Sequence, residues 1–249
     1  MQTSPPNPKL QKHLAEIGLG SRREIERWIE AGRVMVDDHI AQQGERVAAT
    51  STIYVDKKQV WPVTASASVL PSTVWVYHKP VGEITTRHDP EGRPTVFDHL
   101  PPLTYQRWIS IGRLDVNTSG LLLFTTDGEL AQCLTHPSHE IPRVYQMRLY
   151  GKMDDTQRAN LLNGVMLEDG KAQFKSLEHV RGEGANHWYE ASLAEGRNRV
   201  VRRLCESQGI RVNRLVRISF GPVILPEDLM PGKGRFLSKD LTRELYKNV

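Results

Sequence analysis

Residues 112–128 read GRLDVNTSGLLLFTTDG, a stretch whose first half is polar and whose second half is apolar. The apolar run Leu121–Phe124, together with the mostly apolar run Trp108–Ile111 before the stretch, predicts two buried strands joined by a polar loop. Asp115 is the carboxylate of that loop, and Arg113 lies two residues before it. Loops held between rigid strands often carry catalytic groups, but a loop aspartate can equally cap a turn through its own backbone. Spacing alone leaves both roles open for Asp115.

The composition is that of an ordinary globular protein. Hydrophobic residues make up 39% of the 249 residues and charged residues 25%, and the length leaves room for a small domain beside a larger one. No apolar run approaches the roughly 18 residues that a membrane span requires. Residues 1–8 lack the charged and apolar regions of a secretory signal. We therefore expect a cytoplasmic protein without membrane contact.

Cysteine and histidine do not form a pattern typical of a metal site. Cys133 and Cys205 are the two cysteines, too few for a disulfide framework or a cysteine-based zinc site. His136 and His139 lie three residues apart, but no cysteine or carboxylate accompanies them at the spacing of metal ligands. We expect no metal ion in this protein.

Positive charge is concentrated in one segment towards the carboxy-terminal end. Between Glu195 and Arg217, seven arginines are set against two glutamates, which gives this segment a charge of +5. The whole chain has a formal charge of +4, so the remainder sums to −1. A concentrated basic segment that contains arginine and no lysine favours recognition of phosphate or carboxylate groups. The other interpretation is that these arginines form the solvated face of a helix.

The amino-terminal part of the chain has the pattern of a small unit of helices and short strands. Apolar side chains at helical spacing predict a short helix within 9–17. Ser21, followed three residues later by Glu24, forms a capping-box pattern that opens a second helix. Short strands are expected at 34–36 and 53–55.

Residues 63–72 are rich in Ala, Ser and Thr, which is typical of a flexible linker, and mostly short strands are expected after them. The segment 143–150 alternates, with Tyr145, Met147 and Leu149 on one face, and predicts a half-buried strand. An inward tyrosine at such a position is usually a core residue. Helices are expected at 129–134 with Asp127 as N-cap, at 155–162, and in the arginine-rich segment up to Gly209.

Several segments, in the family's order, resemble the pseudouridine synthases of the RsuA/RluB family. They are YHKPVG at 77–82, RHDPEGR at 87–93, GRLDVNTSGLLLFTTDG at 112–128, RVY at 143–145 and EGRNRVVRRLCESQG at 195–209. Ahead of them, the segment KLQKHLAEIGLGSRREIERWIEAGRVMVDDHIA, which begins at Lys9, resembles the S4 RNA-binding domain. The chain is identified as a member of this family on these motifs.

The resemblance implies roles for individual residues. Asp115 is implied to be catalytic, Tyr145 to stack on the target base and help remove a proton, and Arg202 to pair with Asp115. Arg143 stands where lysine is common in the family, and Val200 stands where glutamine or glutamate is common, which puts the polar contact at position 200 in doubt. RNA contacts are implied for Lys79, Arg113, Arg197, Arg199 and Arg203, and in the S4-like part for Lys9, Lys12, Arg22, Arg23 and Arg27.

The same resemblance implies an α+β fold of two domains. A small S4-like αβ RNA-binding domain would span 8–62, followed by the linker at 63–72 and by a catalytic domain at 73–249 with a mixed, mainly antiparallel sheet flanked by helices. The implied reaction is the isomerisation of one uridine in the peptidyl-transferase region of 23S ribosomal RNA, without a cofactor. Because its target atom is inaccessible in a stacked helix, the uridine would be flipped into the active site. The implied partner is 23S ribosomal RNA or a large-subunit precursor particle, bound by a monomer.

Three other functions stay open at this point. The same chemistry could serve another ribosomal RNA site, such as one in the small subunit. A ribosome-assembly factor that binds ribosomal RNA without catalysis would also carry an S4-like domain, although the intact Asp115, Tyr145 and Arg202 argue against it. A glycoside hydrolase would need a second carboxylate, for which Glu195 or Glu129 is available.

Overall fold

The computed structural model describes residues 7–62 and 72–247. The chain falls into two compact units, each with its own hydrophobic core. The first unit contains the residues up to Ser72 together with 102–108, and the second contains 73–101 together with the residues from Ile109 onward.

The structure departs from the predicted division in one segment. Residues 102–108, which the sequence-based division puts in the catalytic domain, pack with the first unit. Within that unit, Arg107 Nη1 donates a hydrogen bond to Gly20 O at 2.5 Å, which holds the segment in place. The predicted linker at 63–72 lies outside the described residues except for Ser72.

The described part of the first unit contains two helices and four short strands. They are α1 (Leu10–Glu16), α2 (Arg22–Glu30), β1 (Val34–Val36), β2 (His39–Ile40), β3 (Ile53–Val55) and β4 (Lys58–Trp61). The strands form an antiparallel sheet of order β2-β1-β3-β4. The predicted capping box is confirmed, since Ser21 Oγ accepts from Glu24 N and Glu24 Oε2 accepts from Ser21 N, both at 3.2 Å. Leu10 and Ile25 bring the two helices into one small core.

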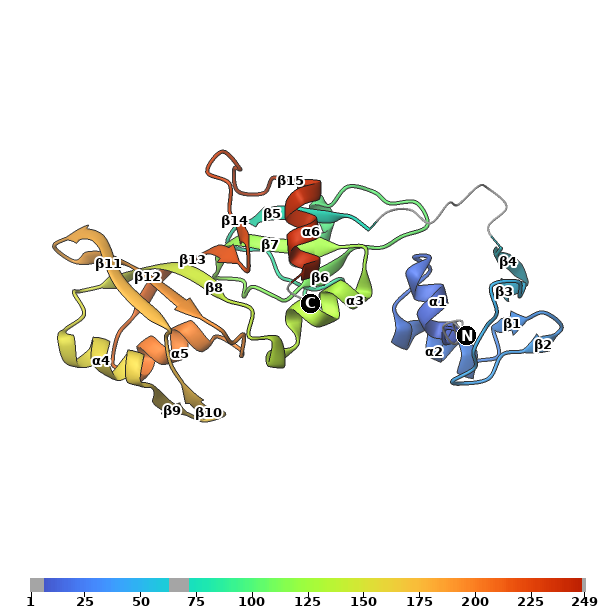
Figure 1. Cartoon of the computed structure of the whole chain (residues 1–249), viewed down its shortest axis with the longest axis horizontal. Helices are drawn as coiled ribbons and strands as arrows, with labels where there is room; N and C mark the ends of the chain where they lie inside the picture. The colour runs from blue at the N-terminus through green and yellow to red at the C-terminus, as the bar shows by residue number, and fades with distance from the viewer. Residues whose placement is uncertain (1–6, 63–71, 248–249) are drawn as a thin grey trace. The chain divides into compact units, whose positions relative to one another are not determined.

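The second unit is built on a large sheet (Figure 1). The strands of the second unit are β5 (Val74–Lys79), β6 (Ile109–Ile111), β7 (Ser119–Thr125), β8 (Arg143–Tyr150), β9 (Val165–Leu167), β10 (Gly170–Ala172), β11 (Ser176–Glu183), β12 (Asn186–Leu193), β13 (Val212–Phe220), β14 (Val223–Ile224) and β15 (Gly234–Phe236). Of these, β9 and β10 form a separate two-stranded sheet. Its helices are α3 (Gly128–Thr135), α4 (Asp155–Asn163), α5 (Val200–Ser207) and α6 (Lys239–Lys247), with the short 3-10 helices η1 (Val96–His99) and η2 (Pro137–His139).

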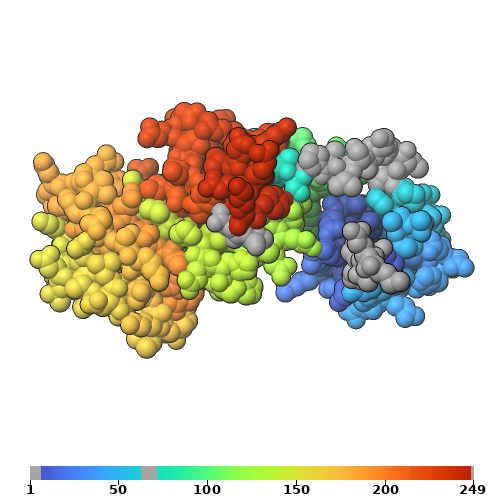
Figure 2. Space-filling model, viewed as in Figure 1, coloured from blue at the N-terminus to red at the C-terminus, as the bar shows by residue number. Residues whose placement is uncertain are grey.

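Nine strands form the main sheet, in the order β11-β12-β8-β13-β7-β5-β15, with β14 paired to β13 and β6 to β7. Its pairings are antiparallel except that of β13 with β7. Helices α4 and α5 lie along one half of the sheet and α3 and α6 along the other (Figure 1). The carboxy-terminal segment, in red, lies beside the yellow-green segment that contains α3 (Figure 2). The predicted α+β fold, with its mixed and mainly antiparallel sheet flanked by helices, is confirmed.

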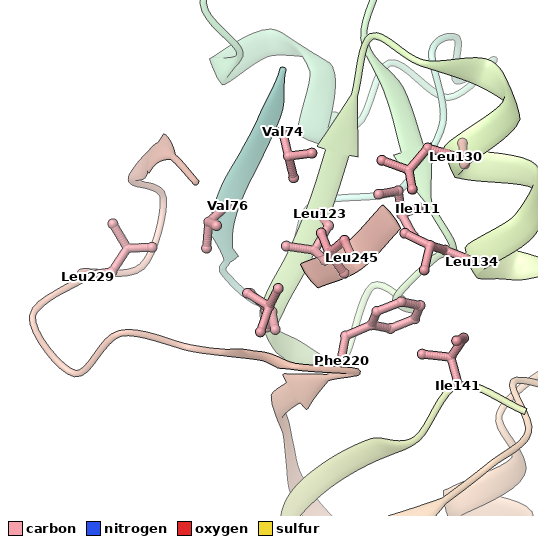
Figure 3. Close-up of a cluster of buried hydrophobic side chains, with 13 residues drawn as sticks. Val74, Val76, Ile111, Leu123, Leu130, Leu134, Ile141, Phe220, Leu229 and Leu245 are labelled. Carbon is pink, nitrogen blue, oxygen red and sulfur yellow. The ribbon is translucent and has the colours of Figure 1, made fainter. Parts of the chain in front are cut away.

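Strand β7 runs through the middle of the core, and all of its residues are buried. A strand covered on both faces reads as a continuous apolar run, which accounts for the sequence Leu121–Phe124. One face packs against α3 and α6, and Leu123, Leu130 and Leu245 belong to the cluster drawn in Figure 3. On the other face Phe124 contacts the aromatic ring of Phe97, with ring centroids 5.5 Å apart.

Gly120 allows the one parallel pairing of the sheet. It pairs with Arg217 of β13 and has a φ of +107°, and a Cβ at this position would lie 2.2 Å from Arg217 O. An alanine would therefore meet both an unfavourable backbone conformation and a backbone clash. The close approach sets the loop before β7 directly beside β13.

Candidate active site

The loop from Gly112 to Thr118, which carries Asp115, is fixed by a buried lysine. Lys79, at the end of β5, is 0% exposed, and its Nζ donates to Pro80 O at 2.9 Å, Asp115 O at 3.1 Å and Thr118 O at 2.9 Å. Burial lowers the pKa of Lys79 to about 8, and the charges of Glu83 and Asp115 oppose this shift. The prediction that Lys79 contacts RNA is wrong, because its side chain does not reach the surface and holds the loop instead.

Two further hydrogen bonds fix the loop backbone on either side of Asp115. Thr85 Oγ1 donates to Leu114 O at 2.9 Å, and Gly82 N donates to Val116 O at 2.9 Å. Both donors come from the segment directly after β5, so the motif that starts at Tyr77 supports the loop.

Arg202, in α5, holds the same loop from another side. Its Nη2 donates to Asn117 O at 2.8 Å and its Nη1 to Val212 O at 2.8 Å. The guanidinium forms no ion pair with Asp115 within the described residues, so the predicted pairing of the two side chains is corrected to a contact with the loop backbone. Burial lowers the pKa of Arg202, as does the charge of Arg199, whereas the negative charge of Asp115 raises it. Arg202 therefore acts on Asp115 through its charge and through the loop.

A buried carboxylate lies behind this loop. Glu83 is 6% exposed, and Tyr77 Oη donates to its two oxygens at 3.0 and 2.8 Å. Burial raises the pKa of Tyr77, and the hydrogen bond to Glu83 adds to this effect. His99 Nε2 lies 3.3 Å from the same carboxylate. Glu83 supplies the nearby negative charge that favours the ammonium of Lys79.

Asp115 and Tyr145 line one cavity of about 460 Å³ in the second unit. Asp115 comes from the loop before β7, and Tyr145, which is 8% exposed, comes from the inward face of β8. The predicted alternation of β8 is confirmed, with Met147 and Leu149 buried on the same face as Tyr145. The other walls are formed by Gly112, Arg113, Leu114, Thr118, Thr135, His136, Pro137, Arg143, Ala194, Glu195, Gly196, Arg197, Asn198, Arg199, Val200, Val201, Leu215 and Arg217.

The charges of the cavity wall are mainly positive. Arginines at five positions face carboxylates at two, Asp115 and Glu195. A cationic cavity attracts a polyanion. The five arginines are Arg113, Arg143, Arg197, Arg199 and Arg217.

Two of these arginines are buried in the wall, a feature that the sequence did not predict. Arg143 and Arg217 are 8% and 2% exposed, and their guanidinium carbons lie 5.0 and 5.2 Å from the ring centroid of Phe220. Arg217 Nε donates to Leu121 O at 2.8 Å. Burial lowers the pKa of Arg143, and the positive charge of Arg217 adds to this effect. Charge patterning could show neither position as buried, because that depends on how β8, β7 and β13 pair.

The arginine-rich segment is less basic at the surface than its composition predicts. Arg197 and Arg203 both bind the carboxylate of Asp169, at 2.9 and 2.8 Å, and Arg197 also pairs with Glu195. Arg199 lies 3.6 Å from a carboxylate oxygen of Glu206. With Arg202 and Arg217 buried, the exposed members that form no ion pair within the described residues are Arg211 and Arg214.

The remaining predicted RNA contacts lie at the surface. Lys12 is partly exposed and lies 3.7 Å from Glu16, and Arg113 is exposed at the cavity. These assignments stay predictions. The other residues of the first unit in this group, all exposed, are Lys9, Arg22, Arg23 and Arg27.

A metal site and a membrane span each require a particular arrangement of residues. Among residues 7–62 and 72–247, no three His, Cys, Asp or Glu side chains gather where they could hold a metal ion. No helix in these two ranges has the length and apolar character needed to cross a membrane.

The chain matches known proteins over both units. Residues 73–207 match the model of the RNA pseudouridylate synthase family, and residues 9–53 match that of the S4 domain. The ribosomal large subunit pseudouridine synthase B of Escherichia coli strain K12 is 53% identical over 240 residues, which cover 96% of this chain and 81% of that protein. The protein of the same name from Pseudomonas aeruginosa is 52% identical over 242 residues, which cover 94% of this chain and 62% of that protein.

A solved structure is similar as well. The crystal structure of a pseudouridylate synthase is 26% identical in sequence, with a TM-score of 0.64, and the match covers 97% of this chain and 99% of that one. The resemblance found in the motifs is therefore confirmed. The chain belongs to the RNA pseudouridylate synthase family of isomerases and carries an S4 domain ahead of the synthase domain.

Proposed function

We propose that this protein converts a uridine of large-subunit ribosomal RNA to pseudouridine, with Asp115 as its catalytic residue and without a cofactor. The observation that carries the proposal is the position of Asp115, on a loop fixed by hydrogen bonds and in the wall of the cavity that Tyr145 also lines. The names of the relatives support the large ribosomal subunit as the substrate. The motif resemblance supports a uridine in the peptidyl-transferase region of 23S ribosomal RNA.

The reaction requires groups of the kind that this cavity contains. The bond between N1 of the base and C1′ of the ribose breaks, a bond between C5 and C1′ forms, and a proton leaves C5 while N1 gains one. Nothing is oxidised and no group is added. An ionised Asp115 can attack the sugar or the base, or stabilise positive charge on the sugar. We assign to Tyr145, which lines the same cavity, the roles of stacking on the base and of helping to remove the proton from C5.

The substrate has to leave its helix before it reaches Asp115. A base that undergoes such chemistry is flipped out of the stack, at a cost of about a few kcal/mol. An aromatic platform such as Tyr145 offsets part of this cost, because stacking of a base on an aromatic side chain contributes about 1–3 kcal/mol. A cavity of about 460 Å³ lies in the range typical of small-molecule sites.

The surroundings of Glu195, the second carboxylate of the cavity wall, favour this function over glycoside hydrolysis. A glycosidase uses one of its carboxyl groups as a proton donor. Glu195 accepts a hydrogen bond from Arg197 Nε, so one of its oxygens is already engaged by a guanidinium. Glu129, the other candidate, lies in the first turn of α3 and is not part of the cavity wall.

The test of the proposal is the Asp115→Asn variant, which keeps the size of the side chain and removes its charge. We expect this variant to release no tritium from 5-tritiated uridine in ribosomal RNA, while its RNA affinity stays close to that of the unchanged protein. Asp154→Asn is the matched control, because Asp154 caps α4 and asparagine caps a helix equally well. Activity of Asp115→Asn equal to that of the unchanged protein would rule out the catalytic assignment.

The target nucleotide is tested separately. Carbodiimide-dependent reverse-transcription stops in ribosomal RNA, compared between cells with and without the gene, locate the uridine. We expect one stop in the peptidyl-transferase region of 23S ribosomal RNA to disappear with the gene. A stop lost from the small-subunit RNA instead would contradict the proposed substrate.

A further inference from the structure

A histidine at the mouth of the cavity has no part in the function described so far. His136 follows the last residue of α3 and precedes η2, and Thr135, His136 and Pro137 together form one section of the cavity wall. The side chain of His136 is exposed, so this section is a rim and not the floor of the cavity. The yellow-green segment that contains α3 and η2 lies at the surface of the second unit (Figure 2).

The ring of His136 is held in one orientation by its neighbour. Its Nδ1 accepts a hydrogen bond from Ser138 N at 3.3 Å and lies 2.7 Å from Ser138 Oγ, so that the side chain caps η2. In the neutral ring, a nitrogen that accepts an N–H bond carries no proton, and the proton is then on Nε2. The charged ring carries a proton on Nε2 as well. With Nδ1 as the acceptor of the bond from Ser138 N, His136 presents an N–H donor at Nε2.

His136 lies in the rim of the cavity, and the backbone of an RNA whose uridine enters the cavity would pass this rim. A flipped nucleotide remains joined to the RNA through its two phosphates, and these stay outside while the base enters. Phosphate oxygens accept hydrogen bonds from side chains and fix the register of the RNA. The positive charge of the cavity wall favours a phosphate at its rim.

We propose that His136 is a positioning residue that donates a hydrogen bond from Nε2 to a phosphate next to the flipped uridine. The proposal rests on the proposed function, because it assumes that a uridine enters the cavity. It assigns to His136 a contact with substrate that is separate from its contact with Ser138. The two contacts use different ring nitrogens, so they can be removed one at a time.

Two substitutions distinguish the contacts made by the two ring nitrogens of His136. His136→Asn retains an acceptor that can cap η2 and removes the donor at Nε2, whereas His136→Gln places an amide N–H near the position of Nε2 and gives up the cap. His139→Asn is the control for the ring contact, because the ring of His139 lies edge-on to that of His136, with centroids 6.0 Å apart, but His139 is not part of the cavity wall. We expect His136→Asn to raise KM about tenfold or more with little change in kcat, and His136→Gln to recover most of the loss. His139→Asn should match the unchanged protein.

The closing experiment removes the other partner of the hydrogen bond. Synthetic RNA hairpins that contain the mapped uridine carry a methylphosphonate at the phosphate on its 5′ or its 3′ side, and Kd and kcat/KM are measured for the unchanged protein and for His136→Asn. At one of the two positions, the methylphosphonate should weaken binding of the unchanged protein about tenfold and that of His136→Asn much less. Equal losses for both proteins at both positions overturn the proposal. Turnover of the unmodified hairpin by the unchanged protein reports on the proposed function itself, so the two failures are distinguishable.

Discussion

Replacing Lys79 with methionine tests how the Asp115 loop is held. Lys79→Met keeps the length of the side chain but removes its charge and its three hydrogen bonds to Pro80 O, Asp115 O and Thr118 O. The three carbonyl groups lose their donor in a region where Lys79 itself is 0% exposed. We expect a loss of stability and a displacement of the Asp115 backbone, and therefore a loss of activity.

The expected loss of stability in Lys79→Met follows from two opposing contributions to the free energy of unfolding. A hydrogen bond from a charged donor contributes about 1.5–3 kcal/mol, so three contribute roughly 4.5–9 kcal/mol. Burial of the ammonium opposes them, since a pKa lowered from 10.5 to about 8 corresponds to ~3.4 kcal/mol. The free energy of unfolding should therefore fall by about 1–6 kcal/mol in Lys79→Met, with a midpoint near 3 kcal/mol.

The difference in stability between the unchanged protein and Lys79→Met should increase as pH rises. In the folded protein Lys79 loses its proton near pH 8, whereas in the unfolded chain it keeps the proton up to its ordinary pKa of 10.5. Between these values the unfolded state binds more protons, so the folded state gains stability as pH rises. The cost of burying the charge is present in full below pH 8 and fades towards pH 10.5. The unchanged protein should therefore gain up to ~3.4 kcal/mol relative to Lys79→Met over this range.

Urea unfolding of both proteins at about pH 7 and about pH 9.5 measures this difference. Lys175→Met, at an exposed position, is the control and should unfold like the unchanged protein. Tritium release measured in parallel should show kcat lowered about a hundredfold in Lys79→Met, since a displacement of about 1 Å in a catalytic group has that effect. A difference in stability that is independent of pH, or a fully active and stable Lys79→Met, would refute the reasoning.

Two further substitutions test the fold around this site and in the first unit. Gly120→Ala should cost more than about 4 kcal/mol of stability, because its Cβ would lie 2.2 Å from Arg217 O. Gly112→Ala, which also has a positive φ but open space around it, should cost only about 1–2 kcal/mol, and similar thermal melts for the two would contradict the clash. Ser21→Ala removes the capping box of α2 and should lower the local stability of that helix by about 1 kcal/mol, seen as faster amide hydrogen exchange. Ser21→Asp retains a cap and should exchange at the unchanged rate.

Local patterns in the sequence predicted the elements that depend on neighbouring residues. The capping box at Ser21, the cap of α3 by Asp127 and the alternation of β8 around Tyr145 are all confirmed. Each depends on residues a few positions apart, so a single segment contains the whole signal. The same holds for the strands on either side of the Asp115 loop, which a run of apolar residues is enough to predict.

The roles of the cations could not be predicted in this way. The sequence-based prediction puts Lys79 at the RNA surface, but two of its three partners lie in a loop more than thirty residues later. Only the pairing of β5 with β7 brings them to Lys79. The same prediction gives Arg203 an RNA contact, yet its guanidinium binds Asp169 in the turn between β9 and β10. A charge in the sequence carries no information on whether a backbone carbonyl, a carboxylate or water will face it in the fold.

The buried cations account together for the rigidity and for the electrostatics of the site. Lys79, Arg202 and Arg217 come from three different elements, β5, α5 and β13, and each donates to backbone carbonyls between Asp115 and Leu121. Because these hydrogen bonds are to neutral carbonyl groups, the bonds themselves do not neutralise the positive charges. Together they place positive charge around the Asp115 loop, which favours the approach of a polyanion. Lys79 and Arg202 thus both hold the loop and contribute positive charge beside it, so a neutral replacement of either one weakens both effects at once.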